Sequence, residues 1–292
     1  MTIARRTFLQ LGAGATAAAS LSTTTLSAAL AAGPAGAAMP GFRANPPEHE
    51  RALVATAEGR CPVHIFKPEG AGPWPGALLL PDGFGIRPTL FQLAQRLADG
   101  GYVVLLPDLF YRHGPYAPLD VKKVFAGENP RQLVSAAVGE SPSNPMASRD
   151  AGPLLDYLLA RPDVKGKKVG VTGYCMSGGM ALTIAADYPD RIAAAASFHG
   201  GTLATDADSS PHWLAARMRA RIYVAGAETD RFYPPEMAAR LEKALTEAGV
   251  NHSCEIYPGT LHGWVMPDSP AYHEQGAERH WRQLFALFAA TL

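Results

Sequence analysis

Short apolar segments alternate with amphipathic segments over most of the chain, and this alternation limits the possible folds more than any other feature of the sequence. Tyr102–Leu106 is a wholly apolar run that ends at Pro107, which is typical of a buried parallel strand. Thr89–Ala98 places leucine and alanine at helical spacing, and Gly100 follows it as a stop signal. Repeated strand–helix units of this kind predict the α/β class, with a mainly parallel central sheet and helices on both faces.

The same patterns give expected bounds for the remaining elements. The other expected strands are Cys61–Phe66, Gly76–Leu80, Lys168–Thr172, Ile192–Phe198, Arg221–Ala225 and Ser253–Tyr257. The other expected helices are Ala151–Leu159, Met176–Ala186, Pro235–Ala248 and Glu278–Leu292. Residues 107–147 contain many Pro and Gly and only short helical signals, so we expect a long loop or a partial cap over a site there. No internal repeat or linker divides residues 50–292, which predicts a single domain.

Residues 1–38 are expected to be an export signal that precedes this domain. Arg5 and Arg6 are their only charges, an Ala- and Gly-rich stretch follows, and small residues in Ala-x-Ala order close the segment. The letters RRTFL, starting at Arg5, resemble the twin-arginine export motif of bacteria. Ser20 and Thr23–Thr25 interrupt the apolar run too early for a membrane anchor. We therefore expect a periplasmic or secreted protein without stable membrane insertion after cleavage.

The charge balance and the cysteine count exclude several kinds of partner and cofactor. The sequence has 26 Lys and Arg against 26 Asp and Glu, whereas proteins that bind nucleic acids usually carry a basic surplus. Its 3 cysteines cannot all pair with one another, so no disulfide framework is expected. The sequence contains no His-Glu-x-x-His, no paired Cys-x-x-Cys and no phosphate-binding Gly-Lys loop, so neither a metal nor a nucleotide is expected. We expect a monomer that acts on a small molecule without a cofactor.

The most specific segment of the sequence is Val169–Gly179, which reads VGVTGYCMSGG. A strand runs into a helix through a tight turn that has Cys175 at the nucleophile position, with Gly173 and Ser177 as small neighbours. Such a turn strains the backbone of the nucleophile and lifts its side chain above the sheet, at the positive end of the helix, where a thiolate is stabilised. Two alternatives remain: Cys175 could be a buried core cysteine, or Ser177 could be the nucleophile.

An acid and a histidine follow Cys175 in the order that α/β-hydrolases use. Asp230 comes after the expected strand Arg221–Ala225, and His262 comes after the last expected strand. Both loops should end at the sheet edge where open α/β sheets bind ligands. His262 would then take the proton from Cys175, and Asp230 would fix the orientation and tautomer of the imidazole. Glu228 is a rival for the acid, and an ordinary surface loop is the alternative for His262.

Residues 173–179, together with Asp230 and His262, resemble the dienelactone hydrolase (carboxymethylenebutenolidase) family of α/β-hydrolases, which use a Cys-His-Asp triad. Residues 80–86 read LPDGFGI and are similar to the family segment after the third strand, where a glutamate normally precedes Phe-Gly. Residues 107–112 read PDLFYR and are similar to the family's Pro-Asp-Leu-Tyr-x-Arg. The resemblance covers about residues 55–290 and implies hydrolysis of an ester or lactone.

The resemblance also implies roles for individual residues. The backbone N–H groups of Gly83 and Met176 would form the oxyanion hole. Asp82 takes the place of the carboxylate that pairs with the resting thiol, one methylene shorter than in the family. Arg112 matches an arginine that helps to hold a substrate carboxylate. His199, which follows an expected strand, is interpreted from its position alone as a packing or capping residue near the pocket.

Two positions depart from the family pattern beside the expected catalytic histidine. The family has a serine directly after that histidine and an arginine four residues after it, and here these places hold Gly263 and Met266. Half of the carboxylate clamp is therefore missing, while the bulky Trp264 is expected to contact the substrate. Arg87 or Arg112 could still bind one carboxylate, but a neutral or larger ester is equally open. Two further alternatives are a catalytically idle binding protein on the same fold and another enzyme class on the same scaffold, such as a peptidase or a dehalogenase.

Overall fold

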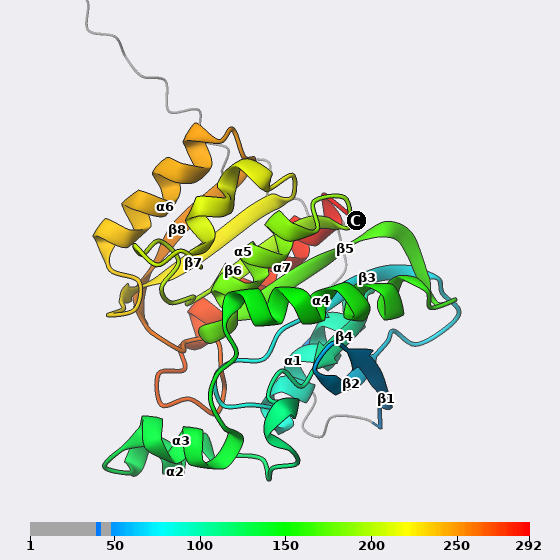
Figure 1. Cartoon of the computed structure of the whole chain (residues 1–292), viewed down its shortest axis with the longest axis horizontal. Helices are drawn as coiled ribbons and strands as arrows, with labels where there is room; N and C mark the ends of the chain where they lie inside the picture. Colours follow the sequence, from blue (N-terminus) through cyan, green and yellow to red (C-terminus); the bar gives the residue numbers. More distant parts are fainter. Residues whose placement is uncertain (1–38, 42–47) are drawn as a thin grey trace, which may run out of the picture.

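The central feature of the fold is an eight-stranded sheet, in the order β1-β2-β4-β3-β5-β6-β7-β8 (Figure 1). The computed structural model describes residues 39–41 and 48–292, so the expected export signal at residues 1–38 lies outside the described residues. The strands are β1 (Glu50–Thr56), β2 (Gly59–Phe66), β3 (Trp74–Leu79), β4 (Val103–Pro107), β5 (Val164–Tyr174), β6 (Ile192–Phe198), β7 (Arg221–Thr229) and β8 (His252–Leu261). The β1–β2 and β2–β4 pairs are antiparallel and the other pairs are parallel, which confirms the predicted α/β class.

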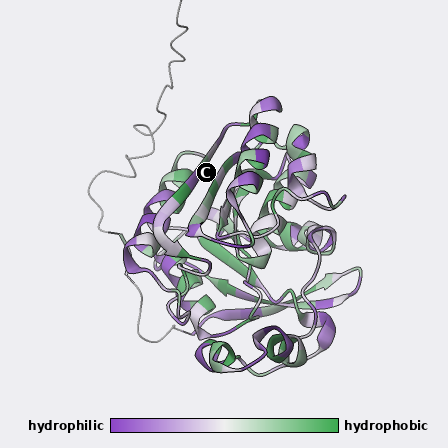
Figure 2. Ribbon diagram, turned by 90° about the vertical axis from the view of Figure 1, so that its left-hand side faces the viewer, coloured by the Kyte–Doolittle hydropathy of each residue, from purple (hydrophilic) through white to green (hydrophobic). Residues whose placement is uncertain are grey.

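Helices cover both faces of the sheet because successive side chains of a strand point to opposite faces. The main helices are α1 (Pro88–Asp99), α4 (Asn144–Leu159), α5 (Met176–Asp187), α6 (Pro235–Glu247) and α7 (Glu274–Ala289). Leu78 and Val171 share one core with α4, α5 and α6, whereas Leu79 and Phe198 share a second core with α1 and α7. Figure 2 shows hydrophobic residues concentrated in the strands at the centre of the molecule. Burying an aliphatic or aromatic side chain of this kind stabilises the fold by about 1.5–3 kcal/mol.

Strand β1 and the start of helix α4 differ from the sequence prediction. The strand β1 was not predicted, because its residues are mostly exposed or half-buried and Leu53 is 51% exposed. Pairing with β2 along its whole length holds it in place. Helix α4 begins at Asn144 rather than at Ala151, with the Ser143 hydroxyl accepting a hydrogen bond from the Met146 N–H at 3.4 Å. A side-chain cap of this kind favours a helix start that hydrophobic spacing alone does not show.

The segment 107–147 contains more regular structure than the expected long loop. Besides the start of α4 it holds a 3₁₀ turn, η2 (Tyr111–His113), and two short helices, α2 (Val121–Ala126) and α3 (Pro130–Val138). Figure 1 shows α2 and α3 at the periphery of the molecule, away from the sheet. The ring of Phe125 on α2 lies 5.6 Å from the ring of Phe84, in the loop after β3. This segment therefore reaches one of the loops at the carboxyl edge of the sheet.

None of the helices within residues 39–41 and 48–292 is both long enough and apolar enough to cross a membrane. All three cysteines are free thiols. Burial raises the pKa of Cys61 and of Cys254 far above the ordinary range of a thiol. Cys175 is the remaining thiol, and it lies at the carboxyl end of β5.

Candidate active site

Cys175 occupies the sharp turn between β5 and α5, with φ 53° and ψ −115°. A positive φ at a residue other than glycine is strained by about 1–3 kcal/mol and persists only where the surroundings fix it. Gly173 permits this turn, because a Cβ there would lie 2.1 Å from the carbonyl oxygen of Ser177. Helix α5 starts directly after Cys175, so the positive end of its dipole faces the sulfur. The predicted strained turn is confirmed.

Ser177, the alternative nucleophile, holds this turn together. Its side chain is fully buried, and its Oγ accepts a hydrogen bond from the Tyr174 N–H at 2.8 Å. The same hydroxyl lies within donating distance of the carbonyl oxygens of Tyr174, at 3.1 Å, and Leu80, at 3.3 Å. A hydroxyl enclosed in this way cannot meet a substrate, so the geometry favours Cys175.

The structure brings Cys175, His262 and Asp230 into a continuous line of contacts. The Nε2 atom of His262 lies 3.1 Å from Cys175 Sγ, and its Nδ1 atom lies 2.7 Å from Asp230 Oδ2. The Asp230 side chain is fully buried, and its Oδ1 accepts a hydrogen bond from the Phe232 N–H at 2.9 Å. The rival acid, Glu228, instead accepts a hydrogen bond at 2.8 Å from the Gly259 N–H, near the end of β8. Asp230, and not Glu228, is thus the carboxylate that contacts the imidazole.

The surroundings of His262 favour its charged form. Burial acts to lower the pKa of His262, but the hydrogen bonds to Asp230 and Cys175 outweigh burial and raise this pKa to about 10. An imidazolium beside the sulfur stabilises a thiolate. The ring of His262 lies between the rings of Phe232, at 5.0 Å, and His199, at 5.2 Å, both edge-to-face. Burial holds the pKa of His199 well below its usual range, so His199 adds no second positive charge.

Two backbone N–H groups beside the sulfur are available for a ligand. Neither Gly83 nor Met176 uses its N–H in a hydrogen bond within the described part of the chain. Met176 is the first residue of α5, where an N–H has no partner inside the helix. A Cβ placed on Gly83 would meet nothing within 4 Å, so the space beside this residue is open. These donors suit a developing negative charge on oxygen.

Comparison with known proteins now identifies the family. A sequence model described as "Dienelactone hydrolase family" matches residues 62–292. The chain belongs to the dienelactone hydrolase family. A Synechocystis relative named "Putative carboxymethylenebutenolidase" is 25% identical over 244 residues, which cover 78% of this chain and 91% of the relative.

Solved structures of dienelactone hydrolases share the fold. The crystal structure named "Putative Dienelactone Hydrolase" from Klebsiella pneumoniae has a TM-score of 0.70 at 21% identity, over 83% of this chain and 98% of that chain. The dienelactone hydrolase from Anabaena variabilis has a TM-score of 0.57 at 21% identity, over 85% of this chain and 99% of that chain. The chain is therefore a dienelactone hydrolase-like hydrolase with an α/β-hydrolase fold.

In this dienelactone hydrolase-like chain Asp82 does not pair with the thiol, contrary to what the resemblance implied. The Oδ1 and Oδ2 atoms of Asp82 accept hydrogen bonds from Arg87 at 2.7 and 2.9 Å, and Oδ1 also accepts one from the Phe84 N–H. Arg87 is 1% exposed and donates to Asp268 as well, at 2.6 and 3.2 Å. Arg87 therefore holds two carboxylates of the protein and is not free to bind one of a substrate.

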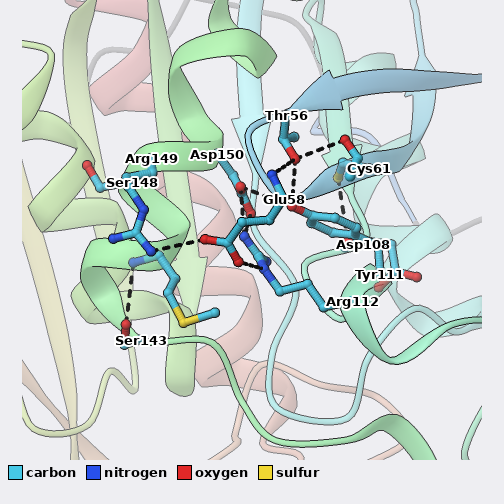
Figure 3. Close-up of polar contacts among 12 residues, drawn as sticks. Thr56, Glu58, Cys61, Asp108, Tyr111, Arg112, Ser143, Ser148, Arg149 and Asp150 are labelled. Carbon is cyan, nitrogen blue, oxygen red and sulfur yellow. Dashed lines mark hydrogen bonds and ion pairs between the residues drawn. The ribbon is translucent and has the colours of Figure 1, made fainter.

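Arg112, which was predicted to contact substrate, is paired with carboxylates of the protein. Its Nη2 atom lies 2.9 Å from both carboxylate oxygens of Asp150, and its Nε atom lies 2.5 Å from Glu58. Figure 3 shows the guanidinium between these two carboxylates, beside the ring of Tyr111. The buried thiol of Cys61 lies nearby and donates to a backbone carbonyl. This cluster joins the β1–β2 hairpin to α4 and has a structural role.

Trp264 is fully buried, which contradicts the expectation that it contacts substrate. Its ring packs against those of His199, at 5.1 Å, and Tyr257, at 5.3 Å. The loop after β8 turns inward, with the Trp264 N–H donating to Leu261, and this turn directs the indole into the core. Trp264 therefore packs against the imidazole of His199, which in turn contacts that of His262. The expectation that His199 packs near the site is confirmed, because its ring is fully buried against His262.

Sequence reasoning missed two residues of this site. Phe232 is 40% exposed beside the His262 ring, and its position two residues after Asp230 was a signal that could have indicated it. Asp268 had no local signal, because its partner Arg87 is 181 residues away in the sequence. Within residues 39–41 and 48–292, no three His, Cys, Asp or Glu side chains are grouped so that they could hold a metal ion.

Proposed function

We propose that this chain hydrolyses a carboxylic ester or lactone with Cys175 as nucleophile, His262 as proton relay and Asp230 as the acid that orients the imidazole. The observation that carries the proposal is the continuous set of contacts from Cys175 Sγ to His262, at 3.1 Å, and from His262 to Asp230, at 2.7 Å. A strained turn at the end of a parallel strand presents the sulfur, and this is the arrangement that a nucleophile needs.

The proposed reaction has two stages. The Cys175 thiolate attacks the carbonyl carbon, and the carbonyl π electrons move to oxygen, where the N–H groups of Gly83 and Met176 stabilise the negative charge. The C–O bond to the alcohol then breaks, and His262 gives its proton to the departing oxygen, which leaves a thioester. His262 next removes a proton from water, the water oxygen attacks the thioester, and the C–S bond breaks to give the acid and the thiolate. Each oxyanion donor typically lowers the barrier by about 2.7–4 kcal/mol.

We further propose a neutral ester with an apolar group as the substrate. The two arginines that could have bound a carboxylate, Arg87 and Arg112, already pair with protein carboxylates. The exposed side chain beside His262 is instead that of Phe232. Burying an apolar substrate group against such a ring is favourable, whereas an unpaired carboxylate would lose its hydration.

The decisive test compares a short-chain fluorogenic ester assay on the wild type, Cys175→Ala and Cys254→Ala. We expect Cys175→Ala to lose at least about 1,000-fold in kcat, while Cys254→Ala, which removes a half-buried thiol on β8, keeps the wild-type rate. Iodoacetamide should label Cys175 first, as read by peptide mass spectrometry. Equal turnover in wild type and Cys175→Ala would remove the thiol from the mechanism. Absence of turnover across an ester panel, with Cys175 unlabelled, would favour the idle binding protein.

We also propose that the protein is exported by the twin-arginine route and acts as a monomer in the periplasm or outside the cell. The charged start, apolar middle and Ala-x-Ala end of residues 1–38 support this proposal. Changing Arg5 and Arg6 together to lysine should keep the protein in the cytoplasm, as cell fractionation and blotting would show. Unchanged export of this variant would exclude the twin-arginine route. Light scattering on the purified protein tests the monomer.

A further inference from the structure

A buried arginine joins the two loops that carry the proposed oxyanion donor and the proposed base. We propose that Arg87 is a positioning residue that fixes the Gly83 N–H relative to His262 and cancels the charge of Asp82 beside the developing oxyanion. The inference rests on the proposed function, in which a tetrahedral oxyanion forms next to Gly83.

The contacts of Arg87 span two separate parts of the chain. On one side it holds both oxygens of Asp82, the residue directly before Gly83, at 2.7 and 2.9 Å. On the other side it holds both oxygens of Asp268, in the loop that follows His262, at 2.6 and 3.2 Å. The guanidinium is planar and its five N–H donors have fixed directions, so bonding two carboxylates at once fixes their relative position.

Further hydrogen bonds hold the loop that carries Gly83 and the loop that follows His262. The loop after β3, which carries Gly83, is also held at Ile86, whose N–H donates to the Tyr116 hydroxyl at 2.9 Å. The loop after His262 contains successive turns, with the Ser269 N–H donating to Met266 at 2.9 Å and the His273 N–H donating to Trp264 at 3.0 Å. Each loop is therefore held by hydrogen bonds of its own, and Arg87 sets the position of one relative to the other.

The charges at this point also favour a positioning role. Asp82 is 2% exposed, and it is the residue directly before Gly83, whose N–H would bind the oxyanion. An uncompensated negative charge there would repel the charge that develops on the substrate oxygen, because a water-poor site screens charges weakly. Arg87 offsets it, and the second carboxylate, that of Asp268, lies farther toward solvent with a side chain 25% exposed.

Two variants separate the positioning role from simple stability. The double variant Asp82→Asn with Arg87→Met removes both charges of the buried pair, and the only carboxylate that loses its partner is that of Asp268, whose side chain is 25% exposed. Asp268→Ala breaks only the link to the His262 loop and leaves the Arg87–Asp82 pair intact. The matched control is Arg161→Met. Arg161 also bonds two carboxylates, those of Glu50 and Asp163, but it lies at the end of α4, where β1 and β5 begin.

Three measurements are made on each purified full chain. The first is kcat and KM for a neutral fluorogenic ester. The second is the dissociation constant of an alkyl trifluoromethyl ketone, followed by ¹⁹F NMR. The Cys175 sulfur adds to the ketone carbon, and the carbonyl π electrons move to an oxygen that needs the same oxyanion donors. The third is the rate of Cys175 alkylation by iodoacetamide, which depends on the thiolate and not on the oxyanion donors.

We expect the double variant and Asp268→Ala to lose about 10- to 100-fold in kcat and in ketone affinity, with KM within about threefold of wild type and the alkylation rate unchanged. Arg161→Met should keep all of these values even if its melting temperature falls. Folded variants with wild-type kcat and ketone affinity would overturn the inference, and so would alkylation that falls in parallel with kcat. A wild type that binds the ketone but hydrolyses no ester, with ketone affinity lost in the double variant and in Asp268→Ala, would refute the proposed function and support the positioning role.

Discussion

Replacing Gly173 with alanine should distort the turn that presents Cys175, because the new methyl group would clash with the backbone of that turn. The new Cβ would lie 2.1 Å from the Ser177 carbonyl oxygen and 2.6 Å from its carbonyl carbon, and both are backbone atoms of the first turn of α5. Real Cβ contacts are essentially never shorter than 3.0 Å, so the turn or the helix must move by about 0.9 Å. Overpacking of this kind destabilises a fold by about 1–3 kcal/mol. A displacement of about 1 Å at the reacting atom lowers kcat by about 100-fold.

A glycine on the same strand provides the control. A Cβ on Gly170 would meet the ring of Phe288 at 2.5 Å, which is also too close, but the ring belongs to α7 and not to the turn. Gly170→Ala should therefore lower stability in urea unfolding while the folded enzyme keeps its kcat. Gly173→Ala should lower both, and its Cys175 should react more slowly with iodoacetamide. If Gly173→Ala kept wild-type kcat with an ester, the crowded contact would not be what shapes the nucleophile turn.

Three further outcomes follow from the geometry. The pKa of His262 is raised to about 10 in the folded state from about 6.5 when unfolded, so its imidazolium stabilises the fold by up to about 5 kcal/mol below pH 6.5. This stability is lost as the pH rises through 10. Urea unfolding at pH 6 and 10.5 should therefore show a larger loss of stability in wild type than in His262→Gln, in which the buried thiols and tyrosines alone cause the loss. Asp230→Asn should lower kcat at least about 100-fold with KM nearly unchanged, and a smaller effect in steady-state kinetics would argue against Asp230 as the orienting acid. Arg112→Met leaves the buried Asp150 without its arginine partner, so it should lower the free energy of unfolding in urea by about 3–5 kcal/mol. The kcat of the folded fraction should stay within twofold of wild type. A loss of kcat without a loss of stability would indicate that Arg112 contacts the substrate after all.

The sequence was sufficient for those features that depend on local pattern and on sheet topology. The turn at Cys175 needed only the small residues beside it, and its strain is visible in the backbone angles. The meeting of Asp230 and His262 followed from a rule of parallel sheets, in which loops after the strands share one edge. The α/β class followed in the same way from the alternation of apolar and amphipathic segments.

The features that failed depend on partners that are distant in the sequence. Arg87 pairs with Asp268, and Arg112 pairs with Glu58 and Asp150, so neither arginine could be recognised as occupied from its neighbours. Trp264 looked available because it follows His262, but a turn carries its ring into the core. Strand β1 was not predicted because it forms by pairing with β2 and not because of its own apolar content.

Each of four parallel strands is followed by one group of the proposed mechanism: β3 by the oxyanion donor, β5 by the nucleophile, β7 by the acid and β8 by the base. These groups therefore come together only when the strands have paired in the correct register. Contacts of this kind join residues far apart in the chain, and folds rich in them assemble slowly. A fragment that lacks any one of these four strands would lack one of the four groups. Recovery of ester turnover after dilution from denaturant should therefore lag behind the return of helical circular dichroism, so enzymatic rate would serve as a reporter of the last steps of folding.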